Sequence, residues 1–456
     1  MENDYRAALD YLYSLTNYEV KLATQYAGQL FDLSRMSRLL DAMEHPERRF
    51  HSVHVAGTKG KGSTAAMIAS VLQHAGQRTG LFSSPHLHTF RERIQVDGQP
   101  ITEREFVAHL RKLRPLFDTL DGLTTFEATQ AIAFDYFIAQ GADWAVVETG
   151  LGGRLDTTNL IRPEVAVITP VSYDHMLVLG DTLTAIAEEK AGIIKPRTPV
   201  VSAPQPEEAL NVISHVAEHL QAPLAVVGRE WGYHLERADW DGQHFTAYGP
   251  GVTLSGLFIP LLGEHQLVNA TAALATLQVL RQGPLPGGAA GGALPIREEA
   301  IREGLRSVRW PARLEILSRE PLLVVDGAHN GESMQRLVEA LTAYFPRRRR
   351  VALFAALADK DVPRMFQALL PNVDTVIFSR TAHPRAADPA ALARQAGPAA
   401  VSAIVEPDFD HALDVALGLA GRDGVVVATG SLSTAAAGRE AWARRMQLEP
   451  LPSDPI

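Results

Sequence analysis

The stretch His54-Val55-Ala56-Gly57-Thr58-Lys59-Gly60-Lys61-Gly62-Ser63-Thr64 decides how this chain folds. Apolar residues alternate at Val53 and Val55, which is the period of a half-buried strand. The alanine-rich segment Ser63 to Ala75 then carries apolar residues at helical spacing. A glycine-rich turn between a strand and a helix points backbone N–H groups at one spot, at the positive end of the helix dipole. We therefore predict a phosphate-binding loop in an α/β domain.

The spacing of this loop departs from the usual nucleotide-binding pattern. That pattern has Gly five residues before Gly60, where this chain has Val55, and Ser or Thr directly after Lys61, where it has Gly62. Lys61 still offers a compact charge for the outer phosphates, and a nearby hydroxyl can bind Mg²⁺. The alternative is a glycine-rich turn with surface lysines. Agreement between strand, turn and helix favours the nucleotide site.

Composition excludes several classes of protein. The chain has 456 residues, enough for two or three domains, and 46% of them are hydrophobic. It has no cysteine, which excludes disulfides and thiolate metal sites. The net charge of -9 argues against a nucleic-acid partner, and no apolar run is long enough to span a membrane. The first residues lack the character of a signal peptide, so we expect a cytoplasmic enzyme.

Lysine is rare in this chain. Lys and Arg together number 43, but only seven of them are lysines. An amine does chemistry that a guanidinium cannot, so lysines in an arginine-biased chain are candidates for functional positions. Lys59, Lys61 and Lys190 are three of the seven.

Polar residues follow several predicted strands of the first domain. Strand 79–83 leads into Ser84, strand 144–147 ends at Glu148, and strand 165–169 leads toward His175. Ligands gather at the C-terminal ends of strands in open α/β sheets. An acid there, near a phosphate loop, is where a Mg²⁺ ligand is expected, and a neutral imidazole can also bind a metal. The alternatives are a carboxylate that caps a turn and a structural histidine.

Other segments are predicted from periodicity and composition. Thr124 is expected to cap a helix, and the glycine-rich loop 149–156 is expected to be approached closely by a substrate. Further helices are predicted over 5–15, 36–43 and 296–308, around 187–192 and from about 263 onward, and a strand over 200–203, with no definite structure assigned to the mixed stretch 204–248. Residues 283–295 are predicted to form a mobile loop, and the Pro-rich tail from Glu449 to be disordered.

A second α/β pattern begins near Trp310-Pro311, where a proline breaks the preceding helix. We predict a P-loop ATPase domain over residues 1–309, with a mostly parallel sheet, and a smaller Rossmann-like α/β domain over 310–456. The predicted strands of the second domain are 322–325, 351–355, 375–379 and 424–428. The first of these ends at Asp326-Gly327-Ala328-His329-Asn330, again polar groups at a strand end.

Seven motifs in order make the chain resemble the folylpolyglutamate synthases, with or without dihydrofolate synthase activity, of the Mur ligase superfamily. The motifs that carry the resemblance are Gly57–Ser63, Ser83-Ser84-Pro85-His86, Glu148–Asp156, Asp174-His175, Glu189-Lys190-Ala191-Gly192-Ile193, Asp326–Asn330 and Ala358-Asp359-Lys360-Asp361. The shifted phosphate loop is the variant that this family uses. The resemblance covers most of the chain and implies an active site between the two domains.

The resemblance also implies roles for single residues. ATP would be held by Thr58, Lys59, Gly60, Lys61, Gly62, Ser63, Asn269, Arg313 and Asp326. Mg²⁺, as two ions, would be bound by Ser84, Glu148 and His175. Lys190 matches a lysine that is carbamylated to support the second metal; with Lys61 and His329 it forms the expected catalytic set. The expected substrate contacts are Leu33, Arg35, Phe126, Arg154 and Asp156.

The implied reaction is ATP-dependent ligation of L-glutamate to the carboxylate of a folate, and of dihydropteroate, through an acyl phosphate. A monomer is expected. The chain departs from the family at Lys59, where Asn is frequent, and at Gly331, where Pro is frequent. The nearest alternative is a Mur-type ligase acting on a UDP-linked peptidoglycan precursor. A P-loop binding switch without ligase activity is an alternative of another class.

Overall fold

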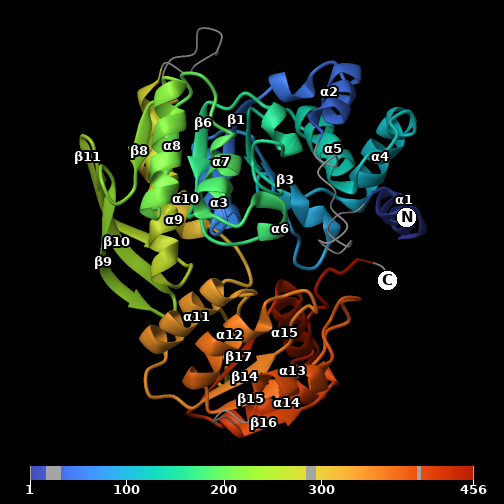
Figure 1. The fold of residues 1–456 in the computed structure, drawn as a ribbon, viewed down its shortest axis with the longest axis vertical. Coiled ribbons are helices and arrows are strands. Elements are labelled where there is room, and N and C mark those ends of the chain that lie inside the picture. The colour runs from blue at the N-terminus through green and yellow to red at the C-terminus, as the bar shows by residue number, and fades with distance from the viewer. Residues whose placement is uncertain (1, 17–31, 284–293, 398–401, 455–456) are drawn as a thin grey trace.

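The structure, a computed structural model, describes residues 2–16, 32–283, 294–397 and 402–454. Two α/β units, each built on a mostly parallel sheet, lie one above the other along the long axis of the molecule (Figure 1). This confirms the predicted fold class. The predicted mobile loop at 283–295 falls almost wholly outside the described residues.

An eight-stranded sheet forms the centre of the first unit, in the order β4-β3-β2-β5-β1-β6-β7-β8. Its strands are β1 (His51–Ala56), β2 (Thr79–Phe82), β3 (Ile94–Val96), β4 (Gln99–Pro100), β5 (Trp144–Glu148), β6 (Val165–Ile168), β7 (Val200–Ser202) and β8 (Leu224–Val226). Six strands are parallel, and β3 and β4 are antiparallel additions at one edge. Strand β1 lies between β5 and β6, with Val55 beside Glu148. The phosphate loop therefore leaves the middle of the sheet.

Helices cover both faces of this sheet because its strands are apolar on both sides. One face packs against α3 (Lys61–His74), α9 (Glu264–Gln282) and α10 (Glu298–Ser307). The other packs against α1 (Glu2–Ser14), α2 (Leu33–Ala42), α4 (Glu103–Phe117), α5 (Thr125–Ala139), α7 (Leu183–Ala191) and α8 (Glu207–His219). Short helices are α6 (Met176–Leu179), η2 (Pro46–Arg48), η3 (Phe90–Arg93) and η4 (Thr157–Leu160). The predicted helices and strands are confirmed, with ends that differ by a few residues.

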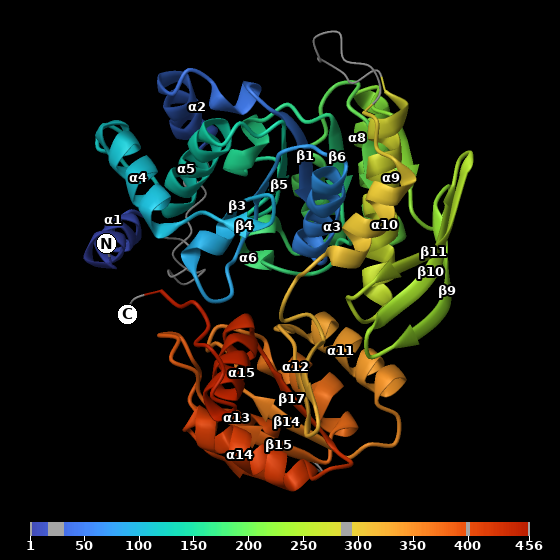
Figure 2. The ribbon, with the colours of Figure 1, turned by 180° about the vertical axis from the view of Figure 1, so that it is seen from behind.

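A separate antiparallel sheet stands beside the first unit (Figure 2). Its strands are β9 (Gly232–Asp239), β10 (Gly242–Gly249) and β11 (Val252–Ile259). Phe245 and Leu257 turn inward and pack with α9 and α10 in one core. Sequence reasoning assigned no structure here, because β9 is mostly exposed and register irregularities interrupt the alternation of β10.

The second unit contains a six-stranded sheet in the order β12-β13-β17-β14-β15-β16. Its strands are β12 (Glu315–Arg319), β13 (Leu322–Val325), β14 (Arg350–Phe354), β15 (Thr375–Phe378), β16 (Ser402–Val405) and β17 (Val425–Thr429). The helices are α11 (Gly331–Tyr344), α12 (Val362–Leu369), α13 (Pro389–Ala396), α14 (Phe409–Ala420) and α15 (Leu432–Arg445), with η5 (Leu370–Asn372). The unpredicted strands β12 and β16 are the two edges, where half-exposed residues leave little apolar pattern.

The tail of the chain returns to the first unit. The Asp454 carboxylate accepts hydrogen bonds from the Tyr5 hydroxyl of α1 and from the backbone N–H of Phe90, both at 2.8 Å. The prediction of a disordered tail from Glu449 is therefore wrong for residues 449–454, because proline-rich composition does not reveal a carboxylate with two distant donors. None of the helices in the described part of the chain combines the length and apolar character needed to cross a bilayer. The proposed domain division at 309/310 falls in the connection between α10 and β12.

Candidate functional site

The phosphate loop is a tight turn that leaves a helix end open. Gly60 precedes α3 with φ 84°, and α3 has no side-chain cap at its start. A Cβ at Gly60 would lie 2.3 Å from Asn269 Oδ1, so both the left-handed backbone and the close approach of α9 require glycine. The first N–H groups of an uncapped helix seek acceptors, and the helix dipole favours an anion there. This turn is suited to phosphate.

Glu148 and Lys61 face each other at the loop. The Lys61 Nζ lies 3.9 Å from Glu148 Oε1, and the backbone N–H of Ser84 lies 3.4 Å from Glu148 Oε2. Glu148 is 4% exposed at the end of β5. Burial raises the pKa of Glu148 to about 7, although Lys61 acts in the opposite direction. A buried carboxylate with so little compensation fits the binding of a cation.

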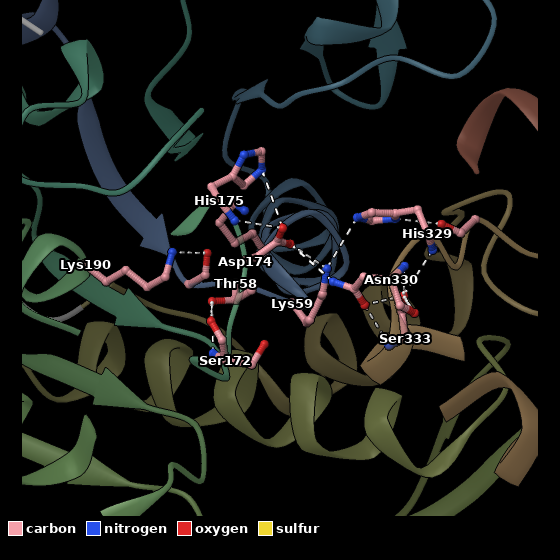
Figure 3. Close-up of polar contacts among 12 residues, drawn as sticks. Thr58, Lys59, Ser172, Asp174, His175, Lys190, His329, Asn330 and Ser333 are labelled. Carbon is pink, nitrogen blue, oxygen red and sulfur yellow. Dashed lines mark hydrogen bonds and ion pairs between the residues drawn. The ribbon is translucent and has the colours of Figure 1, made fainter. Parts of the chain in front are cut away.

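Lys190 reaches the same loop from α7. Its side chain is buried, and its Nζ donates to the backbone carbonyl of Gly57 at 2.8 Å (Figure 3). Burial, followed by repulsion from Lys61, lowers the pKa of Lys190 to about 7. A large fraction of this amine is therefore neutral near physiological pH. A neutral amine is the form that reacts with CO₂, so the environment suits the predicted carbamylation.

The loop is also tied to the segment after β6 and to the second unit (Figure 3). Thr58 Oγ1 lies 3.1 Å from both the backbone N and O of Ser172. Lys59 Nζ lies 2.8 Å from Asp174 Oδ2 and 3.3 Å from His329 Nε2.

The charged neighbours of Asp174 and His329 affect their protonation. Burial alone would raise the pKa of Asp174, but the positive charges of Lys59 and His175 outweigh burial, so the pKa is lowered. Burial, and then Lys59, lowers the pKa of His329 to about 3, so its imidazole is neutral.

His175 stands at the start of α6, with a left-handed backbone at φ 50°. Its side chain is 54% exposed and its Nε2 lies 3.9 Å from Asp174 Oδ1. Within the described residues no group of three or more His, Cys, Asp or Glu side chains is arranged to hold a metal ion. The predicted ligands Ser84, Glu148 and His175 include only two residues of those types, so their joint role stays a prediction.

The second unit presents Arg313 and Asp326. Asp326 accepts 2.8 Å hydrogen bonds from the backbone N–H groups of Leu314 and Ala328, which fix the turn after β13. Burial raises the pKa of Asp326, and burial lowers the pKa of Arg313. The negative charges of Asp326 and Glu148 act on the pKa of Arg313 in the opposite direction, but burial outweighs them. Asn269 Nδ2 donates to Gln266 Oε1 at 3.0 Å, which aims its carboxamide beside Gly60.

The predicted substrate contacts fall into two groups. Leu33 and Arg35 lie on α2, and Arg35 Nε is 3.4 Å from the buried carboxylate of Glu127 on α5. Phe126 lies in the first turn of α5, and its ring lies 5.5 Å from that of Phe82.

The second group lies near α7, where Arg154 pairs with Glu189 at 2.6 Å. Asp156 accepts from the N–H of Leu151 at 2.8 Å and caps η4, so its visible role is to shape the loop.

Sequence reasoning did not single out two hydroxyls. The buried oxygens Thr149 Oγ1 and Ser172 Oγ have no hydrogen-bond partner, and neither has Thr64 Oγ1 in α3. Such atoms are costly unless a ligand or water completes them. Thr149 comes directly after β5, and Ser172 lies in the segment that follows β6; this position near the strand ends is the sequence signal that could have identified them.

Comparisons with known proteins give one consistent result. Residues 55–277 match the model "Mur ligase middle domain", and residues 312–432 match "Mur ligase, glutamate ligase domain". The dihydrofolate synthase/folylpolyglutamate synthase of Bacillus subtilis is 38% identical over 78% of this chain and 82% of its own length. The Mycobacterium tuberculosis protein of the same name is 35% identical over 91% of each chain.

Solved structures agree with these matches. A folylpolyglutamate synthase from Mycobacterium tuberculosis, complexed with ADP and AMPPCP, has a TM-score of 0.85 at 33% identity, covering 99% of this chain and 100% of that one. Escherichia coli FolC, in complex with DHPP and ADP, has a TM-score of 0.84 at 30% identity, covering 97% and 98%. The second-unit residues and the loop residues described above lie inside these matched regions.

Proposed function

Because this chain belongs to the Mur ligase family, it is an ATP-dependent ligase, and we propose that it joins L-glutamate to the γ-carboxylate of a reduced folate. The relatives named as folylpolyglutamate and dihydrofolate synthases cover most of the chain and of their own lengths. The resemblance inferred from the seven motifs is confirmed. The alternative of a UDP-linked peptidoglycan substrate is not favoured.

One observation supports nucleotide chemistry most strongly. The uncapped start of α3 follows Gly60, which is pressed against Asn269, with Lys61 and buried unpartnered hydroxyls around it. This arrangement gives an anion backbone donors, a positive charge and unfilled hydroxyl partners. Related structures hold ADP or AMPPCP. We propose that the backbone N–H groups of Thr58–Ser63, with the side chains of Lys61 and Asn269, hold ATP from the first unit, and that Arg313 and Asp326 contribute from the second.

The residues also fit Mg²⁺. Burial raises the pKa of the Glu148 carboxyl to about 7, and a bound cation would stabilise its ionised form. Ser84, Glu148 and His175 would hold the ion, and carbamylated Lys190 would add a carboxylate for a second one. When bound, Mg²⁺ neutralises negative charge on the phosphates during phosphoryl transfer.

The protein groups would act in two steps. A carboxylate is a poor electrophile, so the folate carboxylate first accepts the γ-phosphoryl group of ATP and becomes an acyl phosphate. Lys61 and the N–H groups of α3 stabilise the charge that develops on the phosphates. The amine of L-glutamate then attacks the acyl carbon, phosphate leaves and an amide forms. Arg313, Asp326 and His329 approach from the second unit, so closure of the two units would exclude water that hydrolyses the intermediate.

Further details extend the proposal. Two relatives carry both synthase names, which supports activity on dihydropteroate as well. We propose that Leu33, Arg35 and Phe126 contact the pterin side of the substrate. We propose that Arg154 and Asp156 contact the part of the substrate that approaches loop 149–156. We also propose a monomer that works in the cytoplasm.

Release of ADP with a panel of acceptors tests the function. The purified protein is expected to release ADP only when ATP, L-glutamate and either tetrahydrofolate or dihydropteroate are all present. Omission of L-glutamate gives the matched blank. Release triggered by a UDP-linked peptidoglycan precursor, and not by any pterin, would instead assign the chain to the other ligase chemistry.

A further inference from the structure

Lys59 is bound differently from Lys61, although both belong to the phosphate loop. Lys61 has only the 3.9 Å approach to Glu148 among its side-chain ion pairs within the described residues. Lys59 is 2.8 Å from Asp174 Oδ2 and 3.3 Å from His329 Nε2, with its side chain 22% exposed. An ammonium group has three donors, and two of those of Lys59 are directed at these partners. Lys61 is therefore the freer cation for phosphate.

The hydrogen bonds of His329 define which of its nitrogens carries a proton. Nδ1 lies 2.9 Å from the carbonyl oxygen of Gly327, which can only accept. Nδ1 is therefore the N–H nitrogen of the neutral ring. Nε2 is then an acceptor, and Lys59, which can only donate, faces it at 3.3 Å. The contact consequently depends on one tautomer and one ring orientation of His329.

A second contact joins the same segments. Asn330 Nδ2 lies 3.4 Å from Asp174 Oδ2, the oxygen that also accepts from Lys59. Asn330 caps α11 and exchanges hydrogen bonds with Ser333, which in turn accepts from the N–H of His329. The loop 327–333 of the second unit is thus fixed internally and docked on the first unit through Lys59 and Asp174 (Figure 3).

We infer that Lys59 is a positioning residue. It ties the phosphate loop to the second unit. It also holds the imidazole of His329, in loop 327–333, in one orientation, with Nε2 directed at the phosphate-binding turn. This inference rests on the proposed function for its kinetic consequence only. Both contacts of Lys59 need a donor at the end of a long side chain, so a side chain without donors could make neither of them.

Kinetics separate a positioning role from simple binding of ATP. Lys59→Met is expected to lower kcat for glutamate-dependent ADP release about 10-fold or more, with a change in KM for ATP below about threefold, because a charge-assisted contact to His329 is lost. In a His329→Ala background the same change is expected to lower kcat by less than about threefold, because the residue through which Lys59 acts is already gone. Lys112→Met, which removes a lysine paired with Asp135 inside the first unit, is the matched control.

A second measurement needs no turnover. Hydrogen exchange of the backbone N–H groups of residues 328–334 in the nucleotide-free protein is expected to accelerate about 10-fold in Lys59→Met and to stay unchanged in Lys112→Met. Unchanged exchange in Lys59→Met would overturn the inference, and so would a rise in KM for ATP with kcat preserved. If the natural protein releases no ADP with any pterin, the proposed function fails, and the exchange measurement still decides the role of Lys59.

Discussion

At the scale of the residue, the phosphate-binding turn gathers charged side chains from several elements. Lys61, Glu148 and Lys190 do surround one turn, as their motifs indicate. The pairing of Lys59 with His329 joins positions 270 residues apart, so no local pattern could reveal it. The capping role of Asp156 and the ion pair of Arg154 with Glu189 could not be predicted either. The sequence pattern of a charged residue beside glycines is the same whether that residue contacts a substrate or a neighbouring helix.

Gly60→Ala tests the shape of the turn at this scale. Gly60 and Gly76 have nearly the same backbone, at φ 84° and 83°. A Cβ at Gly60 would meet Asn269 at 2.3 Å, whereas at Gly76 nothing lies within 4 Å. Both substitutions are expected to cost roughly 1–2 kcal/mol of stability for the left-handed backbone. Only Gly60→Ala is expected to weaken ADP binding, by about 100-fold or more, in isothermal titration. Equal ADP affinity in the two variants would contradict this account of the turn.

Lys190 gives a prediction that depends on pH. Its pKa is lowered from 10.5 to about 7, so the amine is neutral above about pH 7 and protonated below it. Carbamate formation with ¹³CO₂ is therefore expected to rise as the pH is raised from about 6 to about 8, seen as a ¹³C NMR carbamate signal. Lys190→Ala is expected to lose this signal and to turn over more slowly, with partial rescue by short carboxylates. Lys195→Ala, which changes a lysine bonded to Asn159, should keep the signal. A signal that survives in Lys190→Ala would exclude this lysine as the site.

At the scale of the element, what could be predicted depended on burial. Strands with both faces covered, such as β5 and β17, are continuous apolar runs and are found at nearly the expected residues. Edge strands and the three-stranded sheet have exposed faces, so their apolar pattern is weak. Thr124 caps α5 as predicted, with the reciprocal contact from Glu127 that completes a capping box. Capping residues at helix ends could therefore be predicted from the sequence, whereas irregular pairing between strands could not.

The tail provides a prediction for a single segment. The Asp454 carboxylate bonds to the Tyr5 hydroxyl and to the N–H of Phe90. Asp454→Ala is expected to remove about 1–2 kcal/mol of local stability, because two hydrogen bonds to a charged group are lost. Hydrogen exchange at the Phe90 amide should accelerate, while exchange in β1 is unchanged. Asp423→Ala, a substitution in an exposed turn of the second unit, is the control. Full protection of the Phe90 amide in Asp454→Ala would show that the tail contact is not formed in solution.

At the scale of the whole molecule, the two units meet at several separated places. His88, in the loop after β2, lies 3.0 Å from Glu440 and 2.7 Å from Arg439 on α15. Trp240, in the turn between β9 and β10, donates to the backbone carbonyl of Tyr344 at 3.1 Å. Trp310, in the connection, leaves no room for a side chain at Gly62 of the phosphate loop. The two-unit plan was predictable from the repeated α/β pattern, but these contacts were not, because each joins side chains far apart in the sequence.

The central claim is that this protein activates a folate carboxylate as an acyl phosphate with ATP and transfers the acyl group to the amine of L-glutamate. Tetrahydrofolate labelled with ¹⁸O in its γ-carboxylate, incubated with ATP and L-glutamate, tests both halves of the claim in one mass-spectrometric measurement. The account predicts a folate product heavier by one glutamate residue and one ¹⁸O atom transferred to the released phosphate, since the oxygen that bridges carbon and phosphorus leaves with phosphate. A glutamylated product with no label in the phosphate, or no glutamylated product at all, would contradict it.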